Sequence, residues 1–429
     1  MRVLVIGANG FIGSAIVAKL HQASHTTRCV VRNSAHLQHR FPGIDAISLD
    51  LSSEEALDQQ LWYGLLDGID AVVNVAGVLQ PLNPRVSWNV HCNAPDALYS
   101  ACEKLGVRRI VHVSATGVAE ANNSCSRTTR AREDALRKRD LDWTILRPVL
   151  VVGDGSNGGT SMIRALAVNP IFTPVIGDGS IPLGIIHKNE LALGIVELLR
   201  TNNGIKATLE PSCKKEMSMG EVVGSYRSWF GLPKRPIFKI PFWVMVAMGK
   251  VGDLLHLDPI NSTAVAQFRG KMTGDGEQFE RVTGVEVSNL PEILAARPSE
   301  SQDLWHARMF LLRPVIRLVL AMFWLCSGLV GLVRASHLYD AVFAQLVSSD
   351  LVGLVAVLAS SLNVALGLLI LFGWNLRLMA WVQFTFVLVG LALQGVLVPQ
   401  LWFDPTAVLI KNIPILVLIL IHRVVEQER

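Results

Sequence analysis

Apolar residues in the first 200 positions form short, nearly continuous runs that alternate with longer amphipathic stretches. Runs rich in β-branched residues, separated by helical patterns, predict βαβ units and a parallel sheet. The strands of such a sheet are covered by helices on both faces, which explains why the runs are apolar throughout. The predicted strands are residues 2–7, 28–32, 44–50, 70–77, 108–114 and 143–148, and the helical patterns include 13–21, 54–61 and 95–105. We therefore expect an α/β, Rossmann-like, doubly wound parallel sheet over residues 1–203.

The pattern changes after residue 308, where long apolar stretches replace the alternation. Residues 351–374 and 378–398 carry no charged side chain, and each is long enough as a helix to cross a hydrocarbon core of about 30 Å. A third apolar stretch precedes them, and a shorter fourth, interrupted by Lys411 and Pro414, follows. The sequence therefore predicts an all-α, four-helix transmembrane domain over residues 305–425, with helices at 309–333, 351–374, 377–398 and 406–422.

Residues 204–300 have a mixed pattern and are expected to form a substrate-side extension interleaved with the Rossmann domain. Residues 239–255 are apolar on much of their surface but too short to cross a membrane. Two alternatives stay open for them, a core helix and an interfacial helix that rests on the membrane. The polar stretch 296–304 is predicted to be a linker into the first span.

Composition supports a chain that lies partly in lipid, because 51% of its 429 residues are hydrophobic and its mean hydropathy is +0.39. The net charge of +4 gives no sign of a nucleic-acid-binding surface. Six cysteines show neither a CxxC pair nor a Cys/His cluster at metal-binding spacing, so we expect reduced thiols and no metal site. The N-terminal apolar run is too short for a signal peptide.

Charge around the predicted spans indicates their orientation. Four spans place both ends of the membrane domain on one side, together with the N-terminal domain. Cytoplasmic loops are enriched in Lys and Arg. The arginines expected on the side of the N-terminal domain are Arg308, Arg313, Arg317, Arg377, Arg423 and Arg429. Arg334 is expected near the other face, with Lys411 as a second candidate there. This asymmetry predicts a multi-pass protein of the inner, cytoplasmic membrane whose N-terminal domain and C-terminus are cytoplasmic.

A glycine-rich run, GANGFIG at residues 7–13, follows the first predicted strand and opens the first predicted helix. In this context the glycines indicate a dinucleotide site. Gly7 permits a tight turn, Gly10 lets the backbone approach a pyrophosphate, and Gly13 lets the helix pack close to the sheet. The predicted cofactor-binding residues of this loop are Gly7, Asn9, Gly10, Phe11, Ile12 and Gly13.

The choice between NAD(H) and NADP(H) depends on the end of the second predicted strand. A site for NAD normally places an acidic residue there, against the ribose hydroxyls. This chain has Arg32 directly after the apolar run and no acidic residue before Asp45. A guanidinium suits a 2′-phosphate in charge and in donor geometry. We therefore favour NADP(H), with Arg32 as the residue that recognises the 2′-phosphate.

These residues resemble the short-chain dehydrogenase/reductase superfamily, in its extended and atypical, epimerase-like branch that includes the 39-kDa-type accessory subunit of respiratory complex I. The resemblance covers residues 1–200 well and 200–300 loosely. It is carried by GANGFIG (7–13), LDLSS (49–53), NVAG (74–77), RRIVHVSATG (108–117), LDWTILRPVLVVG (141–153) and GDGSIPLGIIHKNELA (177–192).

The resemblance implies roles for several positions around the cofactor. Asp50 and Leu51 would border the adenine, and Pro148 would lie near the nicotinamide. The turn after the fourth strand, which would lie beside the cofactor, contains Val75, Ala76 and Gly77. Ser114 matches the active-site serine of the fifth strand, which orients the carbonyl or hydroxyl of the substrate. His112, two residues earlier, is interpreted as a core histidine.

The C-terminal spans resemble the DoxX-like membrane family through LRPVIRLVLAMFWLCSGLVGL (312–332) and LIKNIPILVLIL (409–420). A fusion of these two modules implies a membrane-tethered, reductase-like protein.

The stretch SCSRTTRARE (124–133) departs from the superfamily at the point where its enzymes keep a Tyr and a Lys four residues apart. The pair acts as general acid and base, with the Lys lowering the pKa of the Tyr. Here Cys125 occupies the Tyr position and Thr129 the Lys position. Cys125 is a candidate acid, and the arginines at 127, 130 and 132 are candidate binders of a polyanionic cofactor.

Three interpretations follow from this departure. The protein binds NADP(H) and transfers hydride with other groups, since hydride transfer needs the cofactor and a positioned substrate. Alternatively, it is a catalytically silent cofactor-binding subunit, structural or sensing, of a membrane assembly. In the third interpretation it acts on a lipophilic substrate from the bilayer, such as a quinone or a lipid-linked sugar. We expect an oxidoreductase of unassigned substrate, with Ser114 and Cys125 as candidate catalytic residues.

Overall fold

The computed structural model describes residues 1–77, 84–117, 124–155, 157–201, 203–257, 261–268, 270, 272–333, 349–405 and 407–426. The chain divides into two compact units. The first unit contains Met1–Gly249 and Ser262–Leu304, and the second contains Lys250–Asn261 and Trp305–Arg429.

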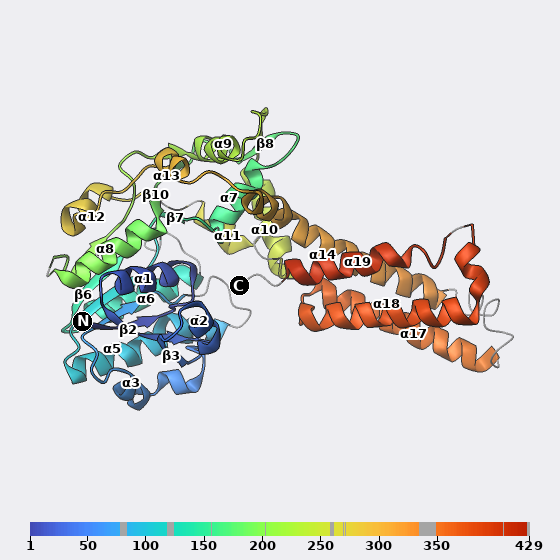
Figure 1. Ribbon diagram of the computed structural model, residues 1–429, viewed down its shortest axis with the longest axis horizontal. Coiled ribbons are helices and arrows are strands. Elements are labelled where there is room, and N and C mark those ends of the chain that lie inside the picture. The colour runs from blue at the N-terminus through green and yellow to red at the C-terminus, as the bar shows by residue number, and fades with distance from the viewer. Residues whose placement is uncertain are drawn as a thin grey trace. The chain divides into compact units, whose positions relative to one another are not determined.

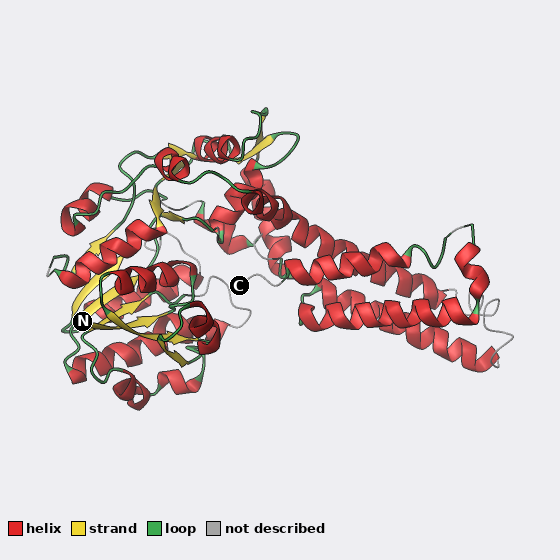
Figure 2. Cartoon of the chain, in the orientation of Figure 1, coloured by secondary structure: helices red, strands yellow, loops and turns green. Residues whose placement is uncertain are grey.

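The first unit is built on a seven-stranded sheet in the order β11-β6-β5-β4-β1-β2-β3, and all six neighbouring pairs are parallel. Figures 1 and 2 show this sheet and the helices that cover it. The strands are β1 (Arg2–Ile6), β2 (Thr26–Val31), β3 (Asp45–Ser48), β4 (Ala71–Asn74), β5 (Arg109–Val113), β6 (Asp142–Leu146) and β11 (Ala207–Leu209). The expected Rossmann-like fold is therefore confirmed. The order reverses between β1 and β4, which is where such sheets bind their ligands.

Helices connect the strands and pack on the sheet. Helix α1 packs against α8, while α3 and α6 both pack against α5. Their bounds are α1 (Phe11–Gln22), α2 (Ser34–Arg40), η1 (Glu54–Leu57), α3 (Gln59–Leu65), α4 (Pro84–Trp88), η2 (Asn89–Asn93), α5 (Ala94–Leu105), α6 (Ser124–Arg137) and α8 (Lys188–Arg200). Helix α5 ends at Gly106, whose φ of +75° gives the left-handed backbone that a glycine adopts without strain.

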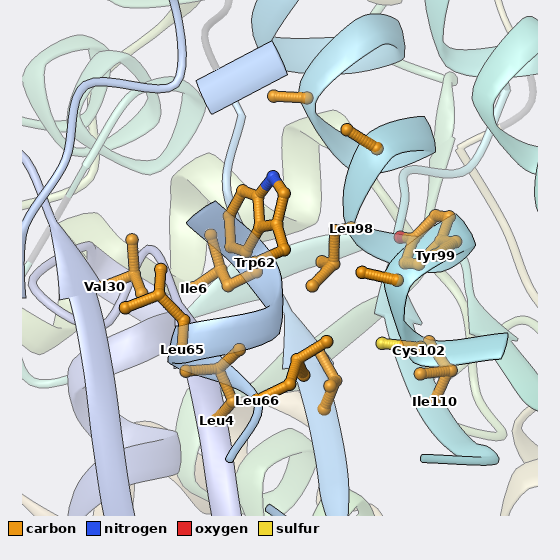
Figure 3. Close-up of a cluster of buried hydrophobic side chains, with 14 of the residues drawn as sticks. Leu4, Ile6, Val30, Trp62, Leu65, Leu66, Leu98, Tyr99, Cys102 and Ile110 are labelled. Atoms are coloured by element: carbon orange, nitrogen blue, oxygen red, sulfur yellow. The ribbon is translucent and has the colours of Figure 1, made fainter. Parts of the chain in front are cut away.

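A hydrophobic core lies between the sheet and the helices α3 and α5 (Figure 3). Trp62 of α3 is fully buried, and its ring N–H donates to the carbonyl of Ala56 over 2.9 Å. The indole therefore fills the core without leaving a buried donor unpaired. The labelled side chains of Figure 3 around it are Leu4, Ile6, Val30, Leu65, Leu66, Leu98, Tyr99, Cys102 and Ile110.

The remainder of the first unit consists of short strand pairs and helices. Strand β10 pairs with β7 and β13 with β8, both parallel, while β12 pairs with β9 antiparallel. The elements are β7 (Leu150–Val152), α7 (Gly159–Ala167), β8 (Thr173–Ile176), β9 (Pro182–Leu183), β10 (Ile185–His187), β12 (Met217–Ser218), α9 (Met219–Trp229), β13 (Ile237–Ile240), α10 (Phe242–Leu255), α11 (Ser262–Gln267), α12 (Gly276–Thr283) and α13 (Leu290–Ala296). Helix α10 continues into the second unit and leaves Trp243 and Leu254 largely exposed, unlike a core helix.

The second unit is helical. It contains most of α14 (Ser301–Val333), together with α17 (Ser349–Leu371), α18 (Leu376–Leu397), η3 (Pro399–Phe403) and α19 (Asn412–Val425). Within the described part of the chain, three helices are long and apolar enough to cross a membrane, namely Ser301–Val333, Gly353–Leu371 and Leu376–Leu397. The apolar helix α19 is shorter, and a fourth crossing by this segment stays a prediction.

Two helices of the C-terminal part begin more than three residues from the positions that the sequence predicts. Helix α14 begins at Ser301, inside the stretch predicted as a linker, because Asp303 accepts a hydrogen bond from the backbone N–H of Glu300 and places an acidic group in the first turn. Helix α19 begins at Asn412 rather than at residue 406, and residues 408–410 form a turn before it. Its Pro414 lies in the first turn, where a missing backbone N–H costs little.

Arg317 fastens several chain segments inside the second unit. Its buried guanidinium donates to the carbonyls of Ile370 and Leu371 at the end of α17, both over 2.8 Å. It also donates to the carbonyls of Leu255 and His256 over 2.7 and 2.8 Å. Arg317, which lies within the first predicted span, therefore joins that helix to the end of α17 and to residues 255–256.

Candidate functional site

The glycine-rich loop connects β1 to α1 at the carboxyl edge of the sheet. Gly7 has a φ of +83°, which a residue with a side chain rarely adopts. A Cβ placed on Gly13 would overlap with the carbonyl oxygen of Gly7. The glycines therefore allow the first turn of α1 to approach the end of β1, and a helix N-terminus at this place in the fold is a site where a phosphate can bind.

The turn after β4 lies directly beside this loop. The N–H of Val75 donates to the carbonyl of Ile6 over 3.0 Å, and a Cβ on Gly7 would come within 2.9 Å of the nitrogen of Ala76. The side chain of Asn74 accepts from the N–H of Ala76 over 3.2 Å and fixes the turn. The structure thus brings the two predicted cofactor segments, residues 7–13 and 75–77, together at the point where the strand order reverses.

The residues predicted for the adenosine half lie at the ends of β2 and β3. Arg32 directly follows β2 and is exposed, and Leu51 is buried. The Asp50 carboxylate accepts from the N–H and the hydroxyl of Ser52 over 2.9 and 2.8 Å. The backbone hydrogen bond from Ser52 holds the pKa of Asp50 below its ordinary value, and the charge of Arg32 contributes to the shift. Asp50 is therefore charged and lies within the electrostatic reach of Arg32.

Ser114 follows β5 and lies beside the end of β6, where its N–H donates to the carbonyl of Leu146 over 2.7 Å. Its hydroxyl donates to the Glu133 carboxylate over 2.6 Å. Pro148 lies next to the same turn, since its carbonyl accepts from the N–H of Thr116 over 3.2 Å. Ser114 and Pro148, the residues predicted near the reacting atoms, thus lie on adjacent chain segments. The Ser114 hydroxyl donates its hydrogen to a carboxylate.

Glu133 is the centre of a buried ion-pair cluster that the sequence did not single out. Its side chain is fully buried and pairs with the guanidinium groups of Arg147 and Arg137. Burial raises the pKa of the Glu133 carboxyl, but hydrogen bonds from Arg147 and Ser114 and the two positive charges more than offset it, so the net pKa is lowered. Both charged residues lie in stretches that the sequence analysis had already singled out. Glu133 ends SCSRTTRARE (124–133), and Arg147 lies within LDWTILRPVLVVG (141–153).

The helix that should carry the catalytic pair is α6. Cys125 belongs to this helix, but its side chain lies outside the described residues. Thr129, at the expected Lys position, is buried. Tyr99 of α5 is fully buried, and its hydroxyl forms a 2.9 Å hydrogen bond with Nδ1 of His112. Burial, with the charges of Arg132 and His91, keeps the pKa of His112 well below its ordinary value, so this histidine is a neutral core residue as expected.

Arg132 of α6 reaches the turn after β4. Its guanidinium donates to the carbonyl of Ala76 over 3.3 Å and lies 3.3 Å from Nδ1 of His91. Arg132 and His91 are both buried, and a Cβ on Gly77 would contact the His91 ring at 3.4 Å. Of the three arginines predicted as cofactor binders, Arg132 is thus placed against the predicted cofactor turn through a backbone contact. Arg127 is exposed and Arg130 is half-buried.

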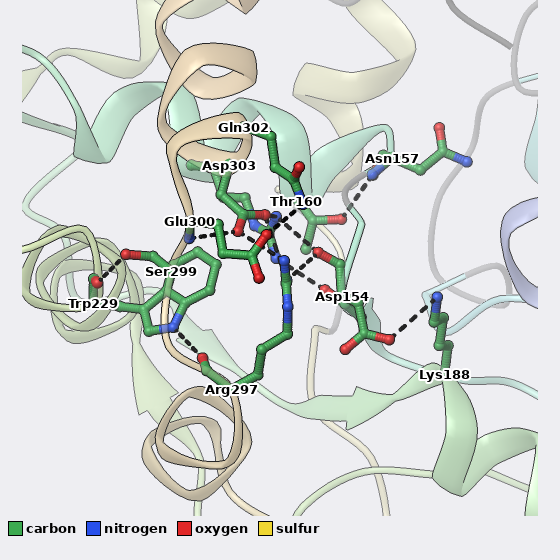
Figure 4. Close-up of polar contacts among 12 residues, drawn as sticks. Asp154, Asn157, Thr160, Lys188, Trp229, Arg297, Ser299, Glu300, Gln302 and Asp303 are labelled. Atoms are coloured by element: carbon green, nitrogen blue, oxygen red, sulfur yellow. Dashed lines mark hydrogen bonds and ion pairs between the residues drawn. The ribbon is translucent and has the colours of Figure 1, made fainter.

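Lys188, the first residue of α8, is a second site residue that the sequence analysis missed. Its ammonium nitrogen lies 5.3 Å from the ring centroid of Phe11, the first residue of α1 in the nucleotide loop. It also lies 3.8 Å from the Asp154 carboxylate, as Figure 4 shows. In the sequence, residues 177–192 carry only the family resemblance, and the approach of Lys188 to the loop depends on how β10 is placed in the fold.

Comparisons with known proteins agree with this geometry. Residues 7–169 match the NAD(P)H-binding family, and residues 321–420 match the DoxX-like family. The structure of the first unit resembles MoeE5 in complex with UDP-glucuronic acid and NAD, with a TM-score of 0.53, 20% identity, and coverage of 72% of this chain and 99% of that chain. A short-chain dehydrogenase/reductase superfamily protein from Agrobacterium tumefaciens with bound NAD gives a TM-score of 0.53 at 14% identity, covering 73% and 99%.

Curated relatives also match by sequence, among them a reductase and an epimerase family protein. The chain is 27% identical over 200 residues to the ceramide reductase of Caulobacter vibrioides, covering 46% of this chain and 61% of the relative. It is 25% identical over 263 residues to an epimerase family protein of Arabidopsis thaliana, covering 54% and 74%. The chain thus spans less than two thirds of the length of the reductase.

The N-terminal part of the chain therefore matches an NAD(P)-binding domain and is similar to short-chain dehydrogenase/reductase, epimerase-like proteins. The C-terminal part matches the DoxX-like family, and with the three apolar helices this match supports association with a membrane.

Proposed function

We propose that the protein is a membrane-anchored, NADP(H)-dependent oxidoreductase that acts on a lipophilic substrate. The observation that carries this proposal is the nucleotide loop, in which Gly7 and Gly13 pack so closely on neighbouring backbone that no side chain fits, and which opens the N-terminus of α1, where a cofactor phosphate would bind. When bound there, the nicotinamide supplies the hydride. The protein holds the cofactor and the substrate in the orientation that the transfer needs.

The preference for NADP(H) rests on Arg32. It lies exposed at the end of β2, beside the strand that carries the nucleotide loop, and it reaches the region of Asp50. A guanidinium at this position pairs with a 2′-phosphate and offers nothing comparable to the two ribose hydroxyls of NAD. We expect NADPH to bind about tenfold more tightly than NADH.

The lipophilic substrate is supported by the DoxX-like domain and by the apolar helices α14, α17 and α18. One relative of the N-terminal domain is named for the reduction of a ceramide, which is a lipid. A quinone or a lipid-linked sugar has the same character, with a polar reacting group on an apolar chain. We propose that the substrate is delivered from the cytoplasmic leaflet of the inner membrane to an N-terminal domain on the cytoplasmic side.

Ser114 is the proposed residue that orients the substrate oxygen. Its proton is engaged by Glu133, but the hydroxyl oxygen keeps lone pairs that accept a hydrogen bond from the hydroxyl of the reduced form of the substrate, an alcohol or a quinol. We propose Cys125 as the neighbouring acid, at the position that relatives fill with Tyr. The assignment of both residues follows from the resemblance of their positions to the superfamily motif.

A second function, cofactor binding without turnover, is favoured by a different observation. Residues 124–137 contain neither Tyr nor Lys, and the Ser114 hydroxyl donates to a buried carboxylate instead of pointing a free proton at a substrate. A subunit of this kind would keep the nucleotide loop intact and use it for structure or sensing. The two functions differ in whether bound NADPH is consumed.

One experiment separates them. The full chain in detergent is titrated with NADPH and with NADH by nicotinamide fluorescence, and a panel of short-chain quinones, lipid-linked sugars and nucleotide sugars is then added while nicotinamide absorbance is followed. We expect NADPH oxidation with a quinone or a lipid-linked sugar, and a lower turnover in Ser114→Ala at unchanged NADPH affinity. NADPH that binds but is oxidised by no member of the panel would establish the silent function instead.

A further inference from the structure

Lys188 lies over the residue that begins the cofactor-binding helix. Its ammonium nitrogen is 5.3 Å from the centre of the Phe11 ring, at the N-terminus of α1. That helix end is the part of a dinucleotide fold that holds a pyrophosphate. The cation therefore lies beside the place where the most highly charged part of the cofactor would bind.

Lys188 packs by its stem and is only weakly paired at its ammonium. Its aliphatic stem covers Gly153 so closely that a Cβ on that glycine would lie 2.7 Å from the Lys188 Cδ. Its ammonium is held loosely, 3.8 Å from an Asp154 carboxylate whose side chain is 55% exposed. A pair at this distance and exposure contributes little and leaves ammonium donors available for a ligand.

The turn that contains Gly153 and Asp154 is fixed by two arginines. Arg164 donates to the carbonyl of Gly153 over 2.9 Å, and Arg297 donates to the carbonyl of Asp154 over 2.8 Å. Both guanidinium groups pair with Asp303, the labelled acid at the centre of Figure 4. Arg164 also stacks on the rings of Trp229 and Tyr226. The turn is thus a firm support for the lysine that packs on it.

The positive charge of Lys188 lies where its surroundings disfavour a cation. Lys188 is the first residue of α8, where a positive charge is disfavoured by the helix dipole. Burial lowers the pKa of Lys188, and the charges of Arg40, Arg297 and Arg164 lower it further against the opposing effect of Asp154. A concentration of positive charge beside a nucleotide loop would be stabilised by a bound polyanion.

We propose that Lys188 binds the pyrophosphate of the nicotinamide cofactor and closes over the nucleotide loop from the side of α8. This inference rests on the proposed cofactor binding, and it adds a side-chain contact to a subsite that the loop otherwise forms from backbone N–H groups. A phosphate carried by the substrate has the same chemistry, so the test measures the cofactor alone, with no substrate present.

The test compares NADPH affinity among variants of the full chain in detergent. Lys188→Met removes the charge but keeps an apolar stem over Gly153, and we expect its Kd for NADPH to rise about tenfold. Lys188→Arg restores the charge and should recover most of the affinity. The matched control is Lys19→Met, which removes a cation from the opposite end of α1, where Lys19 contacts Gln22, and should leave the Kd unchanged.

Two further measurements locate the contact. Adenosine 2′-monophosphate lacks the pyrophosphate, so its affinity should be the same in Lys188→Met and in the wild type. The NADPH affinity of the wild type should fall more steeply with salt than that of Lys188→Met, because one ion pair is missing from the variant. Thermal melting of each variant shows whether it is folded.

An NADPH Kd in Lys188→Met equal to that of the wild type overturns the proposal, and so does an equal loss in Lys19→Met. The readout is binding and not turnover, so its outcome is independent of the oxidoreductase function. If the wild type binds NADPH but oxidises none, the proposed activity fails while the comparison of the Lys188 variants still decides this inference.

Discussion

At the scale of single residues, buried charged side chains hold neighbouring chain segments in place. Glu133 is the clearest case, because one carboxylate accepts from Ser114 and pairs with Arg147 and Arg137. This cluster links α6 to the ends of β5 and β6, the two strands beside the proposed reaction site. A defect at Glu133 would therefore affect both the stability of the fold and the position of Ser114.

We expect Glu133→Gln to destabilise the protein by about 3 kcal/mol, because it removes the charge at a fully buried position that pairs with the half-buried Arg147. In thermal unfolding of the full chain in detergent this corresponds to a drop of a few degrees, because the shift per kcal/mol is smaller in larger proteins. Asp134→Asn is the control on the same helix. Its carboxylate pairs with Arg137 but is 61% exposed, so its loss should change the melting temperature very little. Equal melting temperatures for the two variants would contradict the structural role of Glu133.

The same residue gives the stability a defined pH dependence. The pKa of Glu133 in the folded protein lies below its ordinary value of 4.5, so the unfolded chain takes up the proton first. Its contribution is complete above that value and is lost as the pH falls through the lower folded pKa. The wild type should therefore lose more of its melting temperature than Glu133→Gln between about pH 5 and pH 3. Parallel losses in the two proteins would show that other groups cause the acid sensitivity.

At the scale of elements, the close packing of α14 and α17 depends on small residues. A Cβ on Gly328 of α14 would lie 2.7 Å from the carbonyl oxygen of Ser360 on α17, and a Cβ on Gly367 would lie 2.9 Å from the backbone nitrogen of Leu325. In a membrane, where apolar side chains gain nothing by leaving lipid, such close backbone approach is the main source of helix association.

Gly328→Val should therefore separate these helices, at a cost of about 1–3 kcal/mol from overpacking. The measurement is the melting temperature of the detergent-solubilised chain, together with the rate of its proteolysis. Gly390→Val on α18 is the matched control, because a Cβ there meets no atom within 4 Å. An unchanged melting temperature in Gly328→Val would show that α14 and α17 do not depend on this contact.

At the scale of the whole molecule, we expect the chain to behave as an integral membrane protein. Three described helices are long and apolar enough to span a bilayer, and integral segments are not displaced by high pH, which removes proteins held at the surface by charge. Carbonate extraction of membranes should leave the full chain in the pellet, with a peripheral membrane protein in the same sample as control. Release into the supernatant would refute the predicted spans.

Much of the fold could be predicted because its signals are local. The β-branched runs, the glycines of residues 7–13 and the uncharged stretches each lie within about 25 residues of the chain, and each reports directly on burial or backbone geometry. The strand boundaries were predicted within three residues of β1 to β6. The start of α14 was missed because its first turn is polar and is held by contacts of Asp303 that the sequence pattern does not reveal.

The Rossmann-like sheet, the position of the nucleotide loop and the absence of Tyr and Lys from residues 124–137 could all be inferred from the chain pattern. The partners of the charged side chains could not be inferred in this way. They are Arg147 and Ser114 for Glu133, the carbonyl of Ala76 for Arg132, and the ring of Phe11 for Lys188. The reason is physical. Hydrophobic periodicity depends on neighbours along the chain, whereas a contact between charged side chains depends on distance in space. The packing of α8 against α1 brings Lys188 to a helix that begins at residue 11.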